Sequence, residues 1–198
     1  MVCAKNPINM KKIIIIALFV FGTNQINAQK NISIEAKGNL ESPNPLKCVN
    51  LSEVTNENNP ADILNGMKEC IKQKDFKNAA KLFAIAGVYG KFDIYRVKDK
   101  SAHQALLVLQ QNIIMNLDES ERNSLFESLN KELEKGSNNL NEICQAIRKI
   151  GFPKYYPKYM IQHGIQAFTE KKGDGLNEKF DSIVSWNLAL KEYLHCGE

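Results

Sequence analysis

Apolar side chains recur at helical spacing through most of the chain beyond residue 58. Positions i, i+3, i+4 and i+7 share one face of a helix, and four residues of the segment 59–73 lie on such a face: Ile63, Leu64, Met67 and Ile71. Asn59 and Pro60 come just before them, and these residue types favour the N-cap and the first position of a helix. The pattern therefore predicts a first helix over residues 59–73.

A second helix is predicted from Asp75 to Gly90, with apolar residues at helical spacing: Ala79, Leu82, Phe83, Ala86 and Tyr89. We expect Gly90 to end this helix and Gly87 to mark close packing within it. The stretch from Asp75 to Ala86 resembles the second helix of a tetratricopeptide or Sel1-like repeat. The resemblance covers residues 61–89 and implies a pair of antiparallel helices that approach closely. No second copy follows at a period of about 34 residues, so an array of repeats is not expected.

Five further helices are predicted after a loop at residues 91–100. Ser101 and Gln104 form a capping-box pattern before a helix that reaches Leu117. This helix is apolar on most sides, so it is expected at the centre of the domain. The others are a charged surface helix over about 118–136, a short helix over about 140–150, one from Pro157 to about Phe168, and a last one that follows a turn at residues 171–175 and reaches about Leu194. The predicted fold is all-α, a compact bundle of about seven helices with a tetratricopeptide-like hairpin.

The first 28 residues have the layout of a cleavable secretory signal peptide. Lys11 and Lys12 precede an apolar run at residues 13–21, and a polar stretch ends at Ala28. The apolar run is shorter than the roughly 20 residues that span a bilayer. We therefore expect cleavage after Ala28, a periplasmic or secreted product and no stable membrane anchor. Met10 is the more ordinary start for such a leader.

The mature chain is predicted to contain one domain. Residues 29–58 are polar, hold Pro43 and Pro45, and lack helical or strand periodicity, so we interpret them as a flexible lead-in fixed only at Cys48. Residues 59–198 then form the single helical domain, which is long enough for a substantial core.

Four cysteines remain after the leader: Cys48, Cys70, Cys144 and Cys196. Their wide separation does not fit the close pairs of a metal site, and an even number in an exported chain favours two disulfides. Four cysteines allow three connectivities, which spacing does not separate. We favour Cys48 with Cys70 and Cys144 with Cys196, because each pairing ties a chain end to a helix.

The charge of the mature chain gives no electrostatic signature of nucleic-acid binding. The whole chain has a net charge of +4, and the leader removes three lysines and no acidic residue, which leaves +1. Acidic and basic residues alternate along the mature chain. We therefore expect no nucleic-acid partner.

Three histidines are the candidates for catalysis, and each has a structural alternative. His103 lies in the first turn of a predicted helix and could act as a base or bond locally. His163 lies on an apolar face, where a buried, hydrogen-bonded role is the more common one. His195 adjoins Cys196, and a disulfide there removes a cysteine nucleophile. No assembled catalytic, phosphate-binding or calcium-binding motif is present, so no cofactor, metal or catalytic residue is assigned.

The segment from Phe152 to Met160 is the most distinctive of the chain, with three tyrosines, two prolines and two lysines in nine residues. Such a composition is favoured at protein interfaces, because tyrosine offers a large contact area at low entropic cost. The candidate binding residues are Tyr155, Tyr156, Lys158 and Tyr159. The alternative is that Tyr156 and Tyr159 pack into the core with satisfied hydroxyls.

Three hypotheses on function follow. The first is an exported helical module that binds another protein. In size, export, helical content and disulfides it is similar to the small immunity proteins that neutralise toxins delivered between bacteria, which would make a toxin its partner. The second is a periplasmic hydrolase with His103 or His163 in a cleft. The third is a scaffold protein of the cell envelope that uses its helical hairpin.

Overall fold

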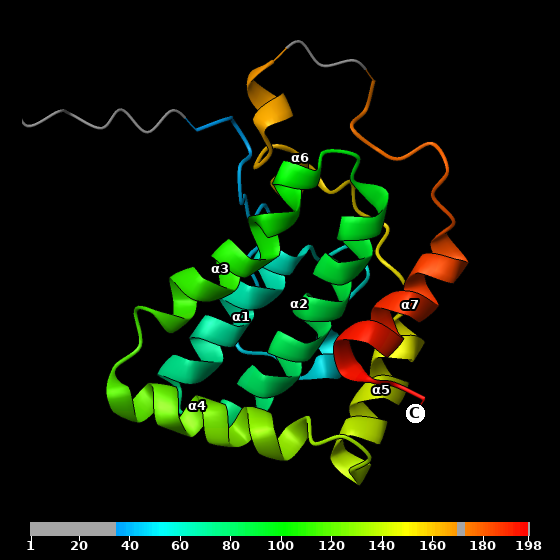
Figure 1. The fold of residues 1–198 in the computed structure, drawn as a ribbon. Helices are drawn as coiled ribbons and strands as arrows, with labels where there is room; N and C mark the ends of the chain where they lie inside the picture. The colour runs from blue at the N-terminus through cyan, green and yellow to red at the C-terminus, as the bar shows by residue number, and fades with distance from the viewer. Residues whose placement is uncertain (1–34, 170–172, 198) are drawn as a thin grey trace, which may run out of the picture. The chain divides into compact units, whose positions relative to one another are not determined.

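The computed structural model describes residues 35–169 and 173–197, so the leader and the first part of the lead-in lie outside it. The described part is all-α, as predicted (Figure 1). Its α-helices are α1 Pro60–Lys72, α2 Phe76–Arg96, α3 Ala105–Ile114, α4 Glu119–Glu132, α5 Asn138–Ile150, α6 Lys158–Ile161 and α7 Ser182–Leu194. Single 3-10 turns lie at η1 Leu51–Glu53, η2 Lys100–Gln104 and η3 Ile165–Phe168.

Helices α1 and α2 form the predicted hairpin. Asn59 caps α1 reciprocally with Asp62: each side chain accepts a hydrogen bond from the other's backbone N–H, at 2.9 and 3.1 Å. Lys74 turns the chain in the left-handed region, with φ of 62°, and Asp75 caps α2 by accepting from the N–H of Asn78. The two helices then pack side by side (Figure 1).

Helix α2 is the centre of the domain, and it extends beyond its predicted end at Gly90. The prediction that Gly90 stops it was wrong, because Leu106 packs directly over this glycine and the side chains of Phe92 and Asp93 are buried beyond it. A glycine within a helix costs about 1 kcal/mol relative to alanine. Burial of the next turn offsets that cost, so α2 continues to Arg96.

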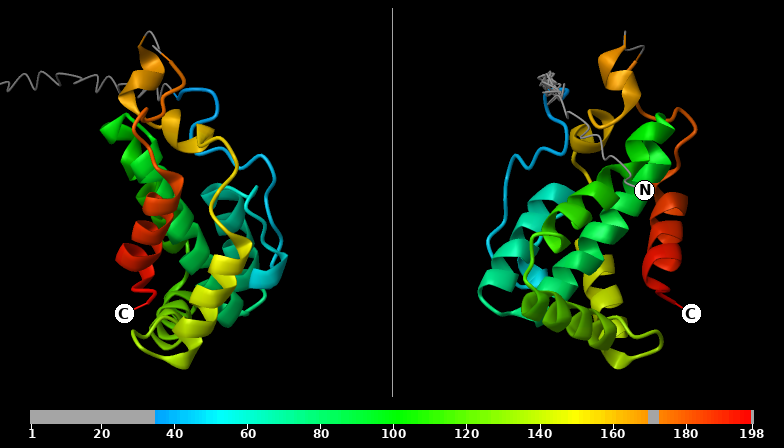
Figure 2. Two further views of the ribbon diagram at one scale, coloured as in Figure 1. Left: turned by 90° about the vertical axis from the view of Figure 1, so that its right-hand side faces the viewer. Right: turned by 60° about the vertical axis from the view of Figure 1, so that its left-hand side comes forward.

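Small residues let neighbouring helices approach α2 closely. The aromatic ring of Tyr193 on α7 lies where a Cβ at Gly87 would stand, which confirms the close packing predicted there. Trp186 of α7 contacts Tyr89 and Phe92, with ring centroids 6.0 and 6.1 Å apart. Helices α4 and α5 also contact α2, and α4 crosses the ends of α1 and α2 (Figures 1 and 2).

Helix α3 does not occupy the centre that its apolar sequence predicts. Only Ala105 and Leu106 of this helix are buried, whereas 52% of Leu107 is exposed. The predicted capping box is also wrong, since the 3-10 turn η2 comes first and Asp99 caps it by accepting from the N–H of Ser101. The place predicted for α3 is taken by α2, because the small residues of α2 permit approach from several sides.

The lead-in is attached at more points than the predicted contact at Cys48. The buried carboxylate of Asp62 accepts hydrogen bonds from the Ser42 hydroxyl at 2.7 Å and the Asn44 N–H at 2.9 Å. Leu51 and Val54 are buried in the core. The prediction of a segment without other fixed points is therefore corrected for residues 35–58, since a buried carboxylate needs such donors.

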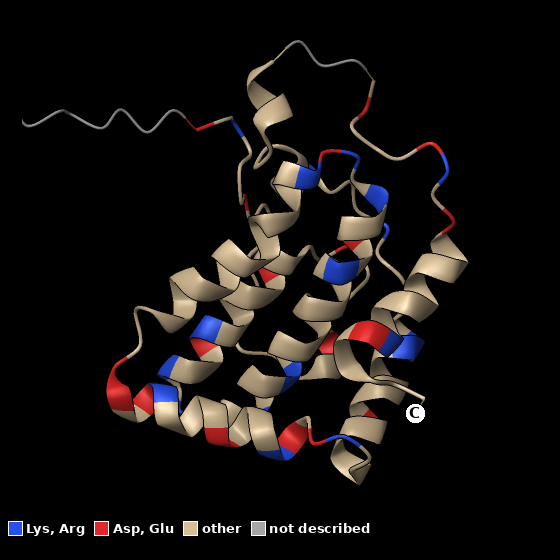
Figure 3. Cartoon of the chain, in the orientation of Figure 1, with Lys and Arg blue, Asp and Glu red and all other residues tan. Residues whose placement is uncertain are grey.

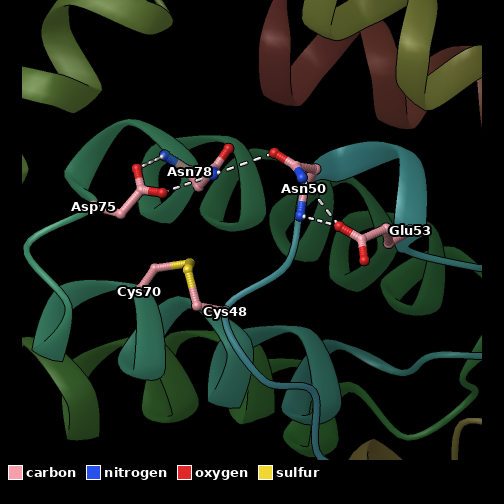
Figure 4. Close-up of a disulfide and its surroundings, with 6 residues drawn as sticks. All are labelled: Cys48, Asn50, Glu53, Cys70, Asp75 and Asn78. Carbon is pink, nitrogen blue, oxygen red and sulfur yellow. Dashed lines mark hydrogen bonds between the residues drawn. A yellow bond between two sulfur atoms is a disulfide. The ribbon is translucent and has the colours of Figure 1, made fainter.

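Both favoured disulfides are present, Cys48–Cys70 and Cys144–Cys196. Figure 4 shows the first joining the lead-in to α1, with a chain of hydrogen bonds nearby in which Asn78 links Asp75 to Asn50. The second joins α5 to the residues after α7. Disulfides of this kind are typical of oxidising compartments. In the described ranges, no helix has the length and apolar character needed to cross a membrane.

Two predicted helices near the C-terminus are shorter than expected. The helix opened by Pro157 ends at Ile161, because the chain turns at Gly164 and is held by η2: the N–H of Gln166 donates to Asp99 at 2.9 Å. The last helix begins at Ser182, where Asp181 caps it by accepting from two backbone N–H groups.

Candidate functional site

The tyrosine-rich segment 152–160 is divided between the interior and the surface. Tyr155 and Tyr159 point inward, and their hydroxyls donate to the same carboxylate oxygen of Asp93, at 2.9 and 2.8 Å. Asp93 is fully buried, and Tyr159 is 1% exposed. Both hydroxyls therefore bond within the molecule. Tyr159 leaves almost no surface for a partner, whereas Tyr155 is partly exposed and its role in binding stays a prediction.

Arg96 completes this internal cluster. Its Nε donates to the other carboxylate oxygen of Asp93 at 2.7 Å, and its Nη2 lies 2.6 Å from the same oxygen. The guanidinium carbon lies 5.3 Å from the ring centroid of Phe92 and 4.9 Å from that of Tyr155. A buried carboxylate needs such partners. The cluster thereby ties the end of α2 to the segment before α6.

Burial sets the protonation of this cluster. Burial, and then the charge of Asp93, raise the pKa of Tyr155 and of Tyr159 well above the usual 10. Both phenols therefore keep their protons and donate at physiological pH. Burial also raises the pKa of Asp93, against the opposing effects of Arg96 and the two phenols.

Tyr156 and Lys158 are the candidate binding residues of this segment that reach the surface, where Phe152 and Lys154 are also exposed. Tyr156 is 51% exposed, which rules out the alternative in which it packs into the core, and its hydroxyl donates to the backbone oxygen of Asp174. Lys158 pairs with Glu41 at 2.7 Å, with about half of each side chain exposed. Both side chains therefore reach the surface, and their role in binding a partner stays a prediction.

The histidines take local roles. His103 donates from Nε2 to the backbone oxygen of Val97 at 2.9 Å. His163 is half-buried, with Nδ1 2.9 Å from the side-chain oxygen of Asn39, and burial lowers its pKa. His195 ends α7 in the left-handed region, with φ of 57°. These contacts match the structural alternatives for His103 and His163.

A concavity lies elsewhere, between α1, α3 and the start of α4. We call it the α1–α3–α4 groove, and its volume is about 430 Å³. It is lined by Ala61, Leu64, Asn65, Lys68, Ile71, Lys72, Leu109, Asn112, Ile113, Asn116, Leu117 and Glu121. On α1 the lining extends from Ala61 to Lys72, which corresponds to about 16 Å of helix. The size falls within the range of ordinary ligand sites.

The groove has a layered lining. Its apolar lining, which we call the floor, comes from α1, α3 and the turn after α3: Leu64, Ile71, Leu109, Ile113 and Leu117. Lys68 and Lys72 on α1 carry its basic positions, while Asn112 on α3 and Asn116 just after α3 carry amides. Figure 3 shows basic positions on α1 and acidic ones at the start of α4. A layered lining of this kind can hold an extended or helical segment with an apolar side.

Sequence reasoning missed this groove, although its signal was present. The apolar residues of α3 are too many for one buried face, and we interpreted the surplus as a sign of a central helix. Two of these residues, Leu109 and Ile113, line the groove, whereas Leu107, the most exposed apolar residue of α3, does not. In the described residues, no cluster of three or more His, Cys, Asp or Glu side chains is placed to hold a metal ion.

The chain was compared with protein families, curated proteins and solved structures. No family model matches it, and no curated protein or solved structure matches it either.

Proposed function

We propose that this protein is an exported helical module that binds another protein through the α1–α3–α4 groove. The observation that carries the proposal is the groove itself, whose lining brings partly exposed apolar side chains of α3 together with those of α1. Contiguous exposed apolar surface marks interaction sites more often than chance, and binding of a helix in a groove is a common mode of recognition.

The experiment uses photo-crosslinking from inside the groove. A crosslinking amino acid at Asn112, which is exposed on the rim, should capture one major partner in the exporting cell, whereas the same group at Glu142 on α5 should not. The captured protein is then purified for titration. Equal capture from both positions would contradict the proposal.

Two variants separate binding from folding in that titration. Ile113→Asp puts a charge on the floor and should weaken binding at least about thirtyfold, which corresponds to about 2 kcal/mol. Asn112→Arg narrows the groove from its exposed rim without removing core contacts, so it should weaken binding while the unfolding curve is unchanged. If neither variant alters affinity, the groove is not the binding surface.

The finer version of the proposal is an immunity protein whose partner is a secreted toxin. A secretory leader, two disulfides and a compact helical domain are the features that this protein would share with that class of proteins. The test is protection: expression of the protein should rescue cells exposed to a toxin encoded beside its gene, and Ile113→Asp should abolish the rescue. Protection by the variant would contradict this version.

A further inference from the structure

The two walls of the α1–α3–α4 groove differ in charge, and the difference bears on what binds there. Lys68 and Lys72 are one helical turn apart on α1 and both are exposed. Lys68 makes no ion pair with another described residue, and Lys72 pairs only with Glu69, where about half of each side chain is exposed. An exposed pair of this kind contributes little energy, so both lysines can engage a ligand.

The opposite wall on α3 is neutral. Asn112 on α3 and Asn116 just after it are exposed, and the Asn116 amide donates to the backbone oxygen of Asn112. Leu109 and Ile113, one turn apart, contribute to the apolar floor. The lining thus holds three kinds of position: basic on α1, apolar on α1 and α3, and amide at the end of α3 and just beyond it. The lysine pair and the Leu109–Ile113 pair each repeat at i, i+4 within a helix, which is the spacing along which an amphipathic helix displays its own faces.

The acidic end of the groove is already compensated. Glu121 pairs with Lys74 at 3.2 Å, and its carboxylate also accepts from the N–H of Asp118. The free charge of the lining is therefore positive and lies on α1, toward Lys68. A ligand that places carboxylates along this wall is attracted electrostatically by Lys68 and Lys72.

We propose that the groove takes an amphipathic helix of a partner protein whose apolar face is bordered on one side by acidic residues. This inference rests on the proposed function and adds the chemistry of the occupant. The acidic row of the ligand lies along Lys68 and Lys72, its apolar row enters the floor, and its polar side meets the asparagines. The length of the lining corresponds to about three turns of such a helix.

The test uses the full mature protein and two helical peptides of about 16 residues. The peptides share one apolar face and differ only in a bordering row of Glu or Lys. Fluorescence anisotropy should show the Glu peptide binding at least about tenfold more tightly, with most of that advantage lost between about 50 and 500 mM salt. Analytical ultracentrifugation at the same concentrations reports the oligomeric state.

The double variant Lys68→Glu, Lys72→Glu should abolish or reverse the preference. The matched control Lys98→Glu, Lys154→Glu changes the net charge equally at exposed loop positions and should retain it. Equal affinity for both peptides, lost in Ile113→Asp, would overturn the acidic occupant but leave the proposed function standing. Binding of neither peptide above a polar control would overturn both. A dimer that Ile113→Asp dissociates would identify a second copy as the occupant and overturn the inference.

Discussion

Helices α2 and α3 are both rich in apolar residues, yet one is the centre of the domain and the other lies at its surface. Thirteen of the 21 residues of α2 are buried, whereas α3 buries two of ten. The buried set on α2 includes many small residues: Ala79, Ala80, Ala84, Ala86, Gly87 and Gly90. Helix α3 instead carries large aliphatic side chains around most of its circumference.

This difference shows that the size of apolar residues, as well as their number, decides which helix is central. Small side chains lower the interhelical distance, so α1, α4 and α7 all contact α2. Large side chains all around α3 allow close packing on one side only, through Ala105 and Leu106. The remainder of α3 is left to form the floor of a groove, and the unused apolar surface of one helix becomes the candidate site.

The largest expected effect lies on α2, at Asp93. Removal of one partner from a buried ion pair costs about 3–5 kcal/mol, because the other charge loses its compensation. Asp93→Ala should therefore lower the free energy of unfolding by that amount in chemical denaturation, since Arg96 and two phenols lose their acceptor. The control Glu192→Ala removes an exposed acceptor of Tyr95 and an ion pair with Lys91, and it should cost much less. Equal costs would show that the cluster is not structural.

A matched pair of leucines compares the two helices directly. Leu82 on α2 is fully buried, and truncation of such a residue costs about 2–5 kcal/mol. Leu107 on α3 is half exposed, so its truncation should cost no more than about 0.5 kcal/mol. Thermal and urea denaturation of Leu82→Ala and Leu107→Ala measure the difference. Similar losses in the two variants would remove the contrast between the helices.

Two glycines of α2 test whether small residues are needed for close packing of the neighbouring helices. Gly87→Ala places a methyl group against the rigid ring of Tyr193, which has to move, so we expect a loss of about 1–2 kcal/mol. At Gly90 the added methyl meets the flexible end of Leu106, and the better helix propensity of alanine, about 1 kcal/mol, offsets the adjustment. Gly90→Ala should therefore be near neutral. A stabilised Gly87→Ala variant would show that close approach of α7 does not depend on this glycine.

Local signals predicted the order of the helices and several of their N-caps. Asn59, Asp75 and Asp118 each cap a helix as their residue types suggest, and the disulfide pairing followed from the need to fix chain ends. The misplacement of α3 and the early end given to α2 have one cause. Both depend on which helix meets which, and that information lies in contacts far apart in sequence, such as Tyr193 over Gly87 and Leu106 over Gly90.

The candidate site was harder to predict than the fold. In the tyrosine-rich segment, composition alone does not separate an inward tyrosine from an outward one. The orientation depends on Asp93 of α2. This buried carboxylate accepts hydrogen bonds from Tyr155 and Tyr159, whereas Tyr156 stays exposed. The groove depends on three helices at once, and only its surplus of apolar residues on α3 is visible in sequence.

The smallest expected effect is at Met115, and it tests the exposed state of α3 itself. This side chain is 76% exposed and belongs to the C-cap residue of α3. Replacement by lysine removes few contacts and places a positive charge near a helix C-terminus, where the helix dipole favours it by about 0.3–1 kcal/mol. Met115→Lys should therefore leave the free energy of unfolding unchanged or raise it by up to about 0.5 kcal/mol in urea denaturation. A loss above about 1 kcal/mol would mean that this end of α3 is covered in the isolated protein. The contrast with α2 would then fail, because both helices would be buried. The apolar side chains of α3 would already be covered within the isolated protein.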